Sequence, residues 1–115
     1  MQGKRLDRVN QLIKEEISLL LQRELKDPRL GFVTVTDVET TKDLRTAKVF
    51  VSVLGDEAQW KASMAALLSA RGFIRAWLRQ HLDLRVTPEL DFRADRSMEH
   101  AARIQELLKQ LGTDR

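Results

Sequence analysis

The chain has 115 residues, of which 43% are hydrophobic and 32% charged, and its net charge is +3. This length predicts one domain, residues 1–115, with a modest core. The absence of cysteine excludes disulfides and thiolate metal sites and is compatible with a reducing compartment. No apolar run is long enough to span a membrane and the polar start is not a secretory signal, so a cytoplasmic protein without membrane contact is expected.

A long amphipathic helix is predicted over residues 5–26, where apolar side chains recur at helical spacing. The Asp27-Pro28 pair should end it, because the residue before proline is disfavoured in helical geometry. Arg5 and Arg8 belong to a basic helix start, which opposes the helix dipole and is consistent with an anionic partner.

Two strands are predicted next, over residues 32–39 and 46–53, and a short polar turn should join them as an antiparallel hairpin. Valine alternates with threonine in the first strand until Val38 breaks the pattern, which makes Val38 a candidate bulge. Arg45 and Lys48 lie on this hairpin, and Lys48 should point away from the apolar face.

Residues 58–82 contain no Asp or Glu, and their cations are Lys61, Arg71, Arg75 and Arg79. The three arginines are four residues apart, so on a helix they form one row. A row of guanidinium groups beside small side chains suits the backbone of a polyanion. A solvated helix face would give the same pattern, so the row alone does not distinguish a polyanion-binding surface from a solvated face.

The apolar side chains of this segment change direction halfway along it. Those of the first half, including Trp60 and Leu67, lie roughly 100° on a helical projection from those of the second half, including Ile74 and Leu78. One straight helix cannot aim both sets at one core. Two helices with a break at residues 69–72 are therefore predicted.

The predicted joint brings together groups that suit a phosphate. Gly72 should make the bend possible at low cost. Ala70, Arg71 and Gly72 would then combine exposed backbone amides, the positive end of a helix and an arginine side chain.

A third strand is predicted over residues 84–92, and Pro88 within it requires an edge or a bulge. Ser97 can cap a last amphipathic helix that Gly112 stops. The order helix, strand, strand, helix, helix, strand, helix predicts an α+β fold with a three-stranded sheet and helices on one face.

The remaining candidate residues favour structural roles. Neither His81 nor His100 has a second ligand at metal spacing, so no metal or other cofactor is expected. Trp60 and Trp77 could stack bases, but both lie on apolar faces and core packing is favoured. Arg29 is expected to make a structural bond or to be solvated more readily than to contact phosphate.

Five stretches resemble one known family. They are Arg8-Val9 with its long helix, residues 25–32 (LKDPRLGF), 43–49 (DLRTAKV), 69–75 (SARGFIR) and 84–92 (LRVTPELDF) leading into Asp95. In this order and spacing, over residues 5–111, they resemble bacterial ribosome-binding factor A. The resemblance implies a KH-like fold of the second type, in which an Ala-x-Gly kink, here Ala70–Gly72, replaces the Gly-x-x-Gly loop.

The resemblance also implies a function. It implies a non-catalytic, monomeric RNA-binding factor for ribosome biogenesis that binds the immature small (30S) ribosomal subunit and assists processing of its 16S ribosomal RNA, including during cold growth. Its implied partners are that subunit and its RNA, with a ribosome-associated GTPase as a functional partner. The residues expected to contact RNA are Ala70, Arg71, Gly72, Arg75, Arg79, Lys61, Arg45, Lys48 and Arg8.

Two other classes stay open. A protein–protein adaptor could present the hairpin edge or the first helix to a partner, with weak salt dependence and no need for RNA. A small ribonuclease would need a positioned acid and base around the scissile phosphate. The chain has no tyrosine and only two, unclustered, histidines, so catalysis is not expected.

Overall fold

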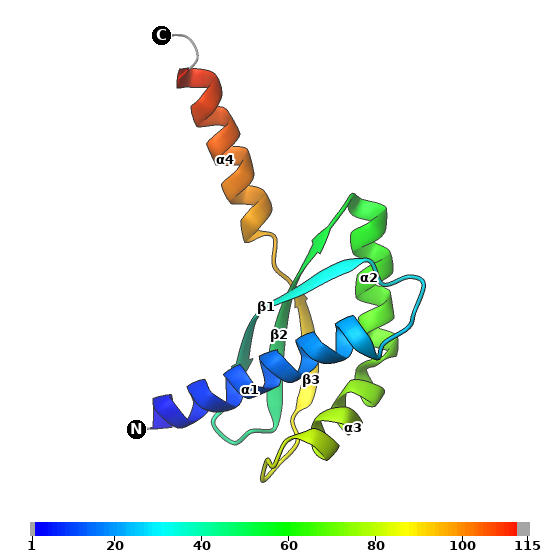
Figure 1. The fold of residues 1–115 in the computed structure, drawn as a ribbon. Coiled ribbons are helices and arrows are strands. Elements are labelled where there is room, and N and C mark those ends of the chain that lie inside the picture. The colour runs from blue at the N-terminus through cyan, green and yellow to red at the C-terminus, as the bar shows by residue number, and fades with distance from the viewer. Residues whose placement is uncertain (1, 113–115) are drawn as a thin grey trace.

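The structure, a computed structural model, describes residues 2–112, and the predicted order of elements is confirmed (Figure 1). None of the described helices is both long and apolar enough to cross a lipid bilayer. The elements are α1 (Gln2–Arg23), β1 (Phe32–Thr40), β2 (Thr46–Leu54), α2 (Glu57–Ser69), α3 (Arg71–His81), β3 (Glu89–Ala94) and α4 (Ser97–Gly112).

The three strands form one mixed sheet in the order β1-β2-β3. β1 pairs with β2 as the predicted antiparallel hairpin, and β3 pairs with β2 in parallel, so the outer edge of β3 has no strand partner in the described residues. The parallel pairing follows from the connection, since α2 and α3 carry the chain back to the starting end of β2. α1 crosses one face of the sheet, and α2 and α3 pack beside β2 and β3 (Figure 1).

The bulge in β1 lies two residues earlier than predicted. The register shifts between Val35 and Asp37, so Thr36 is the extra residue and Val38 is not. Because of this extra residue, Val35 and Val38 face the same side of the sheet although they are three positions apart. Both face the core and are 3% and 2% exposed.

The core lies between the sheet and the helices. β2 alternates strictly, with Ala47, Val49, Val51 and Val53 buried and its other side chains more exposed. This is the pattern expected of a strand with one covered face. The largest helix side chains that complete the core are Ile13, Ile17 and Leu20 from α1, Leu67 from α2, and Ile74 and Leu78 from α3.

α1 ends at Arg23, three residues before the predicted end, so the Asp27-Pro28 pair does not stop it directly. The amides of Glu24 and Leu25 both donate to the Leu20 carbonyl, at 2.9 and 3.0 Å, which closes the helix earlier. The carboxylate of Asp27 accepts hydrogen bonds from the Arg29 amide at 2.9 Å and its guanidinium at 2.7 and 3.1 Å. These bonds lower the pKa of Asp27 and confirm a structural role for Arg29.

The predicted break between the two helices is confirmed at a single residue. α2 ends at Ser69 and α3 begins at Arg71, and Ala70 between them has φ −88° and ψ 1°. Gly72 lies inside α3, without a positive φ, and a Cβ there would have nothing within 4 Å. The expectation that Gly72 makes the bend possible at low cost is therefore wrong, because the turn falls at Ala70, whose φ is negative.

β3 begins at Glu89 and not at residue 84, because Pro88 has no amide to donate to a ladder. Residues 83–88 are a loop that leads into the strand.

α4 differs most from the prediction. Its first turn is capped by Asp95, whose carboxylate accepts from the Ser97 amide at 2.9 Å, so Ser97 is not the cap. α4 leaves the body of the protein (Figure 1) and has no buried side chain, so it does not cover the sheet as expected. Its exposed apolar side chains are Met98, Ile104, Leu107, Leu108 and Leu111.

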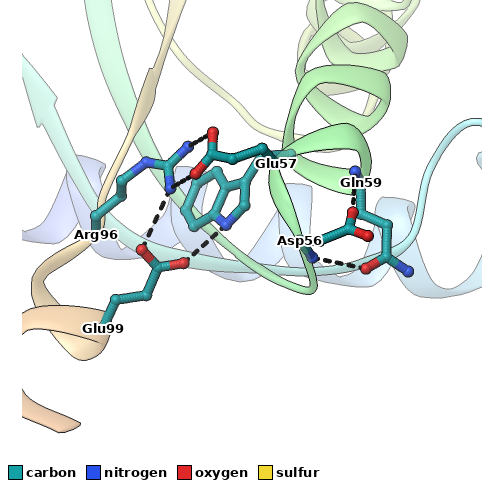
Figure 2. A network of polar contacts seen from close by, with 6 residues as sticks. Asp56, Glu57, Gln59, Arg96 and Glu99 are labelled. Carbon is teal, nitrogen blue, oxygen red and sulfur yellow. Dashed lines mark hydrogen bonds and ion pairs between the residues drawn. The ribbon is translucent and has the colours of Figure 1, made fainter. Parts of the chain in front are cut away.

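A polar network joins the start of α4 to the start of α2 (Figure 2). The indole of Trp60, which is 2% exposed, donates to Glu99 at 2.9 Å. Arg96 forms a bidentate pair with Glu57 at 2.7 and 3.0 Å, and its guanidinium carbon lies 4.2 Å from the centre of the Trp60 ring. A third hydrogen bond from Arg96 reaches Glu99 at 3.2 Å, so charge and stacking both hold the first turn of α4.

Candidate nucleic-acid interface

Arg75 faces the chain that enters β3. Its Nη2 donates to the Thr87 carbonyl at 2.9 Å and its Nε to the Pro88 carbonyl at 3.2 Å, while Nη1 lies 3.3 Å from the Glu89 carboxylate. The side chain is 32% exposed. Because its donors are engaged within the protein, Arg75 holds the loop before β3, and the arginine row does not consist of three equivalent cations.

Cations from three elements meet at Asp91 on the opposite face of the sheet from the core. Lys48 of β2 is the register partner of Asp91 in β3. Arg93 donates two hydrogen bonds to the Asp91 carboxylate, at 2.9 and 3.0 Å. These bonds lower the pKa of Asp91 most, and the nearby charges of Lys48 and Arg71 lower it further. We call Lys48, Arg71 and Arg93 the β3-edge cluster; with Asp91 the group has two positive charges in excess.

One member of the β3-edge cluster, Arg71, is the first residue of α3. Ala70 occupies the N-cap position and supplies no side-chain acceptor to the first turn. Arg71 and Gly72 are exposed there. Uncapped amides and the positive end of the helix dipole attract an anion, and Arg71 adds a full charge at the same place. Of the groups predicted at the joint, Arg71 and the positive end of α3 are present, whereas the Ala70 amide is not free because it donates to the Ala66 carbonyl at 3.0 Å.

Four other predicted residues are not among the cations that lower the pKa of Asp91. Arg79, Lys61 and Arg8 are exposed on α3, α2 and α1, and across residues 2–112 no hydrogen bond or ion pair engages them. Arg45 lies in the hairpin turn, with its Nε 3.7 Å from an Asp43 carboxylate oxygen. The charges of Arg71 and Lys48 thus both act on Asp91, and those of these four residues do not.

Arg93 is a residue that the sequence reasoning missed. The sequence predicts an end of the third strand at residue 92, whereas β3 continues to Ala94. In a longer strand, alternation alone places Arg93 on the face of Asp91. Its closeness to Arg71 could not be predicted, since that depends on how α3 packs against the sheet.

The predicted core roles of the tryptophans are confirmed. Trp60 is buried, and Trp77 packs against the core and donates from its indole to Glu16 at 2.9 Å. His81 stacks on Trp77 at 3.9 Å between ring centres, which is a structural role, and His100 is exposed. Across residues 2–112, no three His, Cys, Asp or Glu side chains are grouped closely enough to hold a metal.

An α+β domain with a three-stranded mixed sheet, a helix pair broken at Ala70 and cations at that break defines a KH-like protein. A sequence profile described as ribosome-binding factor A matches residues 5–108. The chain belongs to the ribosome-binding factor A family.

Relatives and solved structures agree with this assignment. The ribosome-binding factor A of Brevibacillus brevis is 46% identical over 114 residues, covering 99% of this chain and 94% of that protein. That of Halothermothrix orenii is 51% identical over 111 residues, covering 96% and 91%. The crystal structure of ribosome-binding factor A from Thermus thermophilus superposes with a TM-score of 0.69 at 27% identity, covering 77% of this chain and 94% of that one.

A second structure concerns a complex. It is a homology model of the Thermus thermophilus ribosome-binding factor A fitted into a cryo-electron-microscopy map of a complex with the 30S subunit. It matches with a TM-score of 0.63 at 29% identity, covering 75% of this chain and 90% of that one.

Proposed function

We propose that this protein binds the immature small (30S) ribosomal subunit through its RNA and assists processing of the 16S ribosomal RNA without catalysing a reaction. The observation that carries the proposal is the β3-edge cluster beside the uncapped start of α3. Membership of the ribosome-binding factor A family and the 30S complex of the Thermus thermophilus relative support it.

In this proposal the RNA backbone lies along the outer edge of β3. Arg71 and the first-turn amides of α3, residues 71–73, hold one phosphate, and Lys48 and Arg93 hold its neighbours. Arg75 contributes by fixing the loop into β3, while Arg79 and Lys61 extend the positive surface along the helices. Because these contacts are to phosphates, recognition depends on the shape of the RNA and little on its bases.

The described residues offer no acid–base pair to the RNA at this site. Asp91 is held ionised by Arg93, so it is a poor proton donor at neutral pH. His81 is stacked on Trp77, with its Nδ1 2.9 Å from the Trp77 carbonyl. A binding role therefore fits the site better than hydrolysis. We further propose that the protein is a monomeric, single-domain cytoplasmic protein that acts during cold growth alongside a ribosome-associated GTPase.

The test is titration of a variant with Lys48, Arg71 and Arg93 replaced by alanine onto isolated 30S subunits at several salt concentrations. Each phosphate that the variant no longer neutralises should flatten the slope of log affinity against log salt by about 0.7–0.9. The slope of the triple variant should therefore be flatter by roughly two to three. Circular dichroism checks that the variant is folded.

The matched control replaces three exposed cations that do not belong to the β3-edge cluster, Arg23, Lys26 and Lys109, with alanine. It removes the same charge and should change the slope much less. Equal effects of the two triple variants, or an unchanged slope in the first, would reject the β3-edge cluster as the RNA site. Capture of the 30S subunit that survives nuclease removal of exposed RNA would instead favour a protein adaptor.

A further inference from the structure

A positively charged cleft lies at the other end of the protein from α4. There the start of α1, the β1–β2 turn and the loop before β3 come together (Figure 1). They enclose an open cleft of about 230 Å³. Its lining residues are Arg5, Leu6, Lys42, Asp43, Leu44, Arg85 and Val86.

The rim of this cleft is cationic. Arg5, Lys42 and Arg85 come from three different segments, all are exposed, and across residues 2–112 none is engaged in a hydrogen bond or ion pair. Asp43 is the one acid in the lining. One of its oxygens is used within the turn, accepting from the Thr41 hydroxyl at 2.7 Å and the Arg45 amide at 3.1 Å. The lining thus keeps two positive charges in excess, which favours an anion.

The remaining lining is apolar. Leu6 and Leu44 are half-buried and Val86 is 37% exposed. Leu44 has φ 63°, a left-handed conformation that is unfavourable for a leucine, and its amide donates to the Thr41 carbonyl at 2.9 Å. A hollow with apolar walls and a cationic rim suits a ligand that has both an anionic group and a flat apolar part.

Hydrogen bonds fix each segment of the cleft to the next. The Asn10 side chain on α1 accepts from the Thr40 amide at 2.9 Å. The Arg45 carbonyl accepts from the Glu89 amide at 2.8 Å, and Arg75 holds the carbonyl groups that follow Val86. The cleft is therefore preformed, which lowers the entropic cost of binding.

We propose that this cleft is a second RNA site that takes one nucleotide of an unpaired strand, its phosphate on the cationic rim and its sugar and base against the apolar walls. The volume of the cleft is below the roughly 300–1,000 Å³ of sites for drug-sized ligands. This size suits one nucleotide unit and is too small for an RNA double helix. Arg75 links the cleft to the β3-edge cluster through the shared loop, so one strand can run along the β3 edge and end here. The inference rests on the proposed function, since it requires RNA as the partner.

The experiment follows the backbone amides of the full chain by NMR during titration with an unstructured six-nucleotide RNA. Amide signals should shift in two groups, one at residues 70–73 and one at residues 42–44 and 85–86. Replacing Arg5, Lys42 and Arg85 with alanine should abolish the second group and keep the first. It should also flatten the salt slope by about 0.7 for each phosphate that these cations neutralise.

Two further variants separate the possible failures. The alanine triple at the β3-edge cluster should abolish the first group of shifts and keep the second. Leu44→Asn suits the left-handed backbone and removes an apolar wall, so it should remain folded and weaken only the second group. Shifts confined to residues 70–73 in the unmodified protein would overturn the second site and leave the proposed function standing.

A complete absence of shifts, together with failure to bind 30S subunits, would overturn both proposals. Titration with a six-residue glutamate peptide distinguishes RNA from acidic protein. Equal shifts at the cleft with the peptide would show an anion site without preference for nucleotides and would overturn the inference.

Discussion

Asp95 shows how one side chain can fix the junction of three elements. Its carboxylate accepts from the Thr36 hydroxyl in the β1 bulge at 2.6 Å and from the Ser97 amide at the start of α4, and its own amide donates to the Val51 carbonyl of β2 at 2.7 Å. The bond from Thr36 lowers the pKa of Asp95 most, followed by those from Ser97.

Replacing Asp95 with alanine should lower the free energy of unfolding at pH 7 by about 1 kcal/mol, a typical value for a lost helix cap. Because the folded pKa is below the unfolded value of about 3.9, the stabilisation is present above that value and is lost as pH falls through the folded pKa. In urea unfolding, the difference in free energy of unfolding between the Asp95→Ala variant and the parent protein should be smaller at pH 3 than at pH 7. Asp83→Ala, at an exposed position, is the control. A difference between Asp95→Ala and the parent protein that does not change with pH would contradict the argument.

Two glycines should respond in opposite ways to the same substitution. Gly72→Ala should raise the free energy of unfolding by roughly 0.5–1 kcal/mol, because alanine is the better helix former and a Cβ meets nothing there. Gly55 has φ 153°, and a Cβ there would overlap the Gln59 side chain of the α2 capping box, so Gly55→Ala should destabilise. Thermal unfolding measures both; a destabilised Gly72→Ala variant would show that the break does require glycine.

Sequence spacing at this scale predicted where side chains lie but not what they bond. The four-residue interval correctly placed Arg71, Arg75 and Arg79 on one helix. It could not show that two carbonyl groups before β3 accept from Arg75, since those acceptors come from a loop whose path depends on tertiary packing.

At the scale of elements, the hydrophobic pattern carried most of the prediction. The change of phase between Trp60 and Ile74 located the helix break correctly because both halves must face one core. The same reasoning misplaced the β1 bulge at Val38, since alternation shows that a residue has been added but not which one. It also began the third strand too early, because the apolar residues before Pro88 belong to a loop.

Arg75→Ala should loosen that loop. Losing charge-assisted hydrogen bonds to two carbonyl groups should speed hydrogen exchange at the Glu89 amide and lower the free energy of unfolding by about 1–2 kcal/mol. Arg75→Lys should keep only part of the slow exchange at Glu89 and of the stability, because an ammonium group lacks the planar fork of a guanidinium group. Arg79→Ala tests a cation on the same helix without such bonds and should leave exchange at Glu89 unchanged. Similar exchange in the Arg75 and Arg79 variants would contradict this role.

The molecule as a whole is elongated, with extents of 58 × 40 × 19 Å, because α4 projects from the body (Figure 1). The sequence predicted the amphipathic character of this helix correctly. It could not predict that the apolar side remains uncovered, because periodicity identifies an apolar stripe without identifying what covers it.

Removal of residues 101–115 should therefore change the free energy of unfolding little. The truncated chain keeps Arg96 and Glu99 and loses no buried side chain of α4. A chain ending at residue 95 should be clearly less stable, because Trp60 would lose its hydrogen-bond acceptor and its cation partner. Urea midpoints of the two truncations measure the difference, and equal midpoints would contradict the importance of the network in Figure 2.

The contact of Arg96 with Trp60 has a mechanical consequence. With 16 residues rising about 1.5 Å each, α4 is a rod about 24 Å long that is clamped at one end. A tilt of about 10° at the clamp would move the far end by about 4 Å. The contact between the Arg96 guanidinium and the Trp60 indole is thus the point about which α4 would rotate. A rotation too small to disturb the packing of Trp60 would change the direction of the whole apolar stripe of α4.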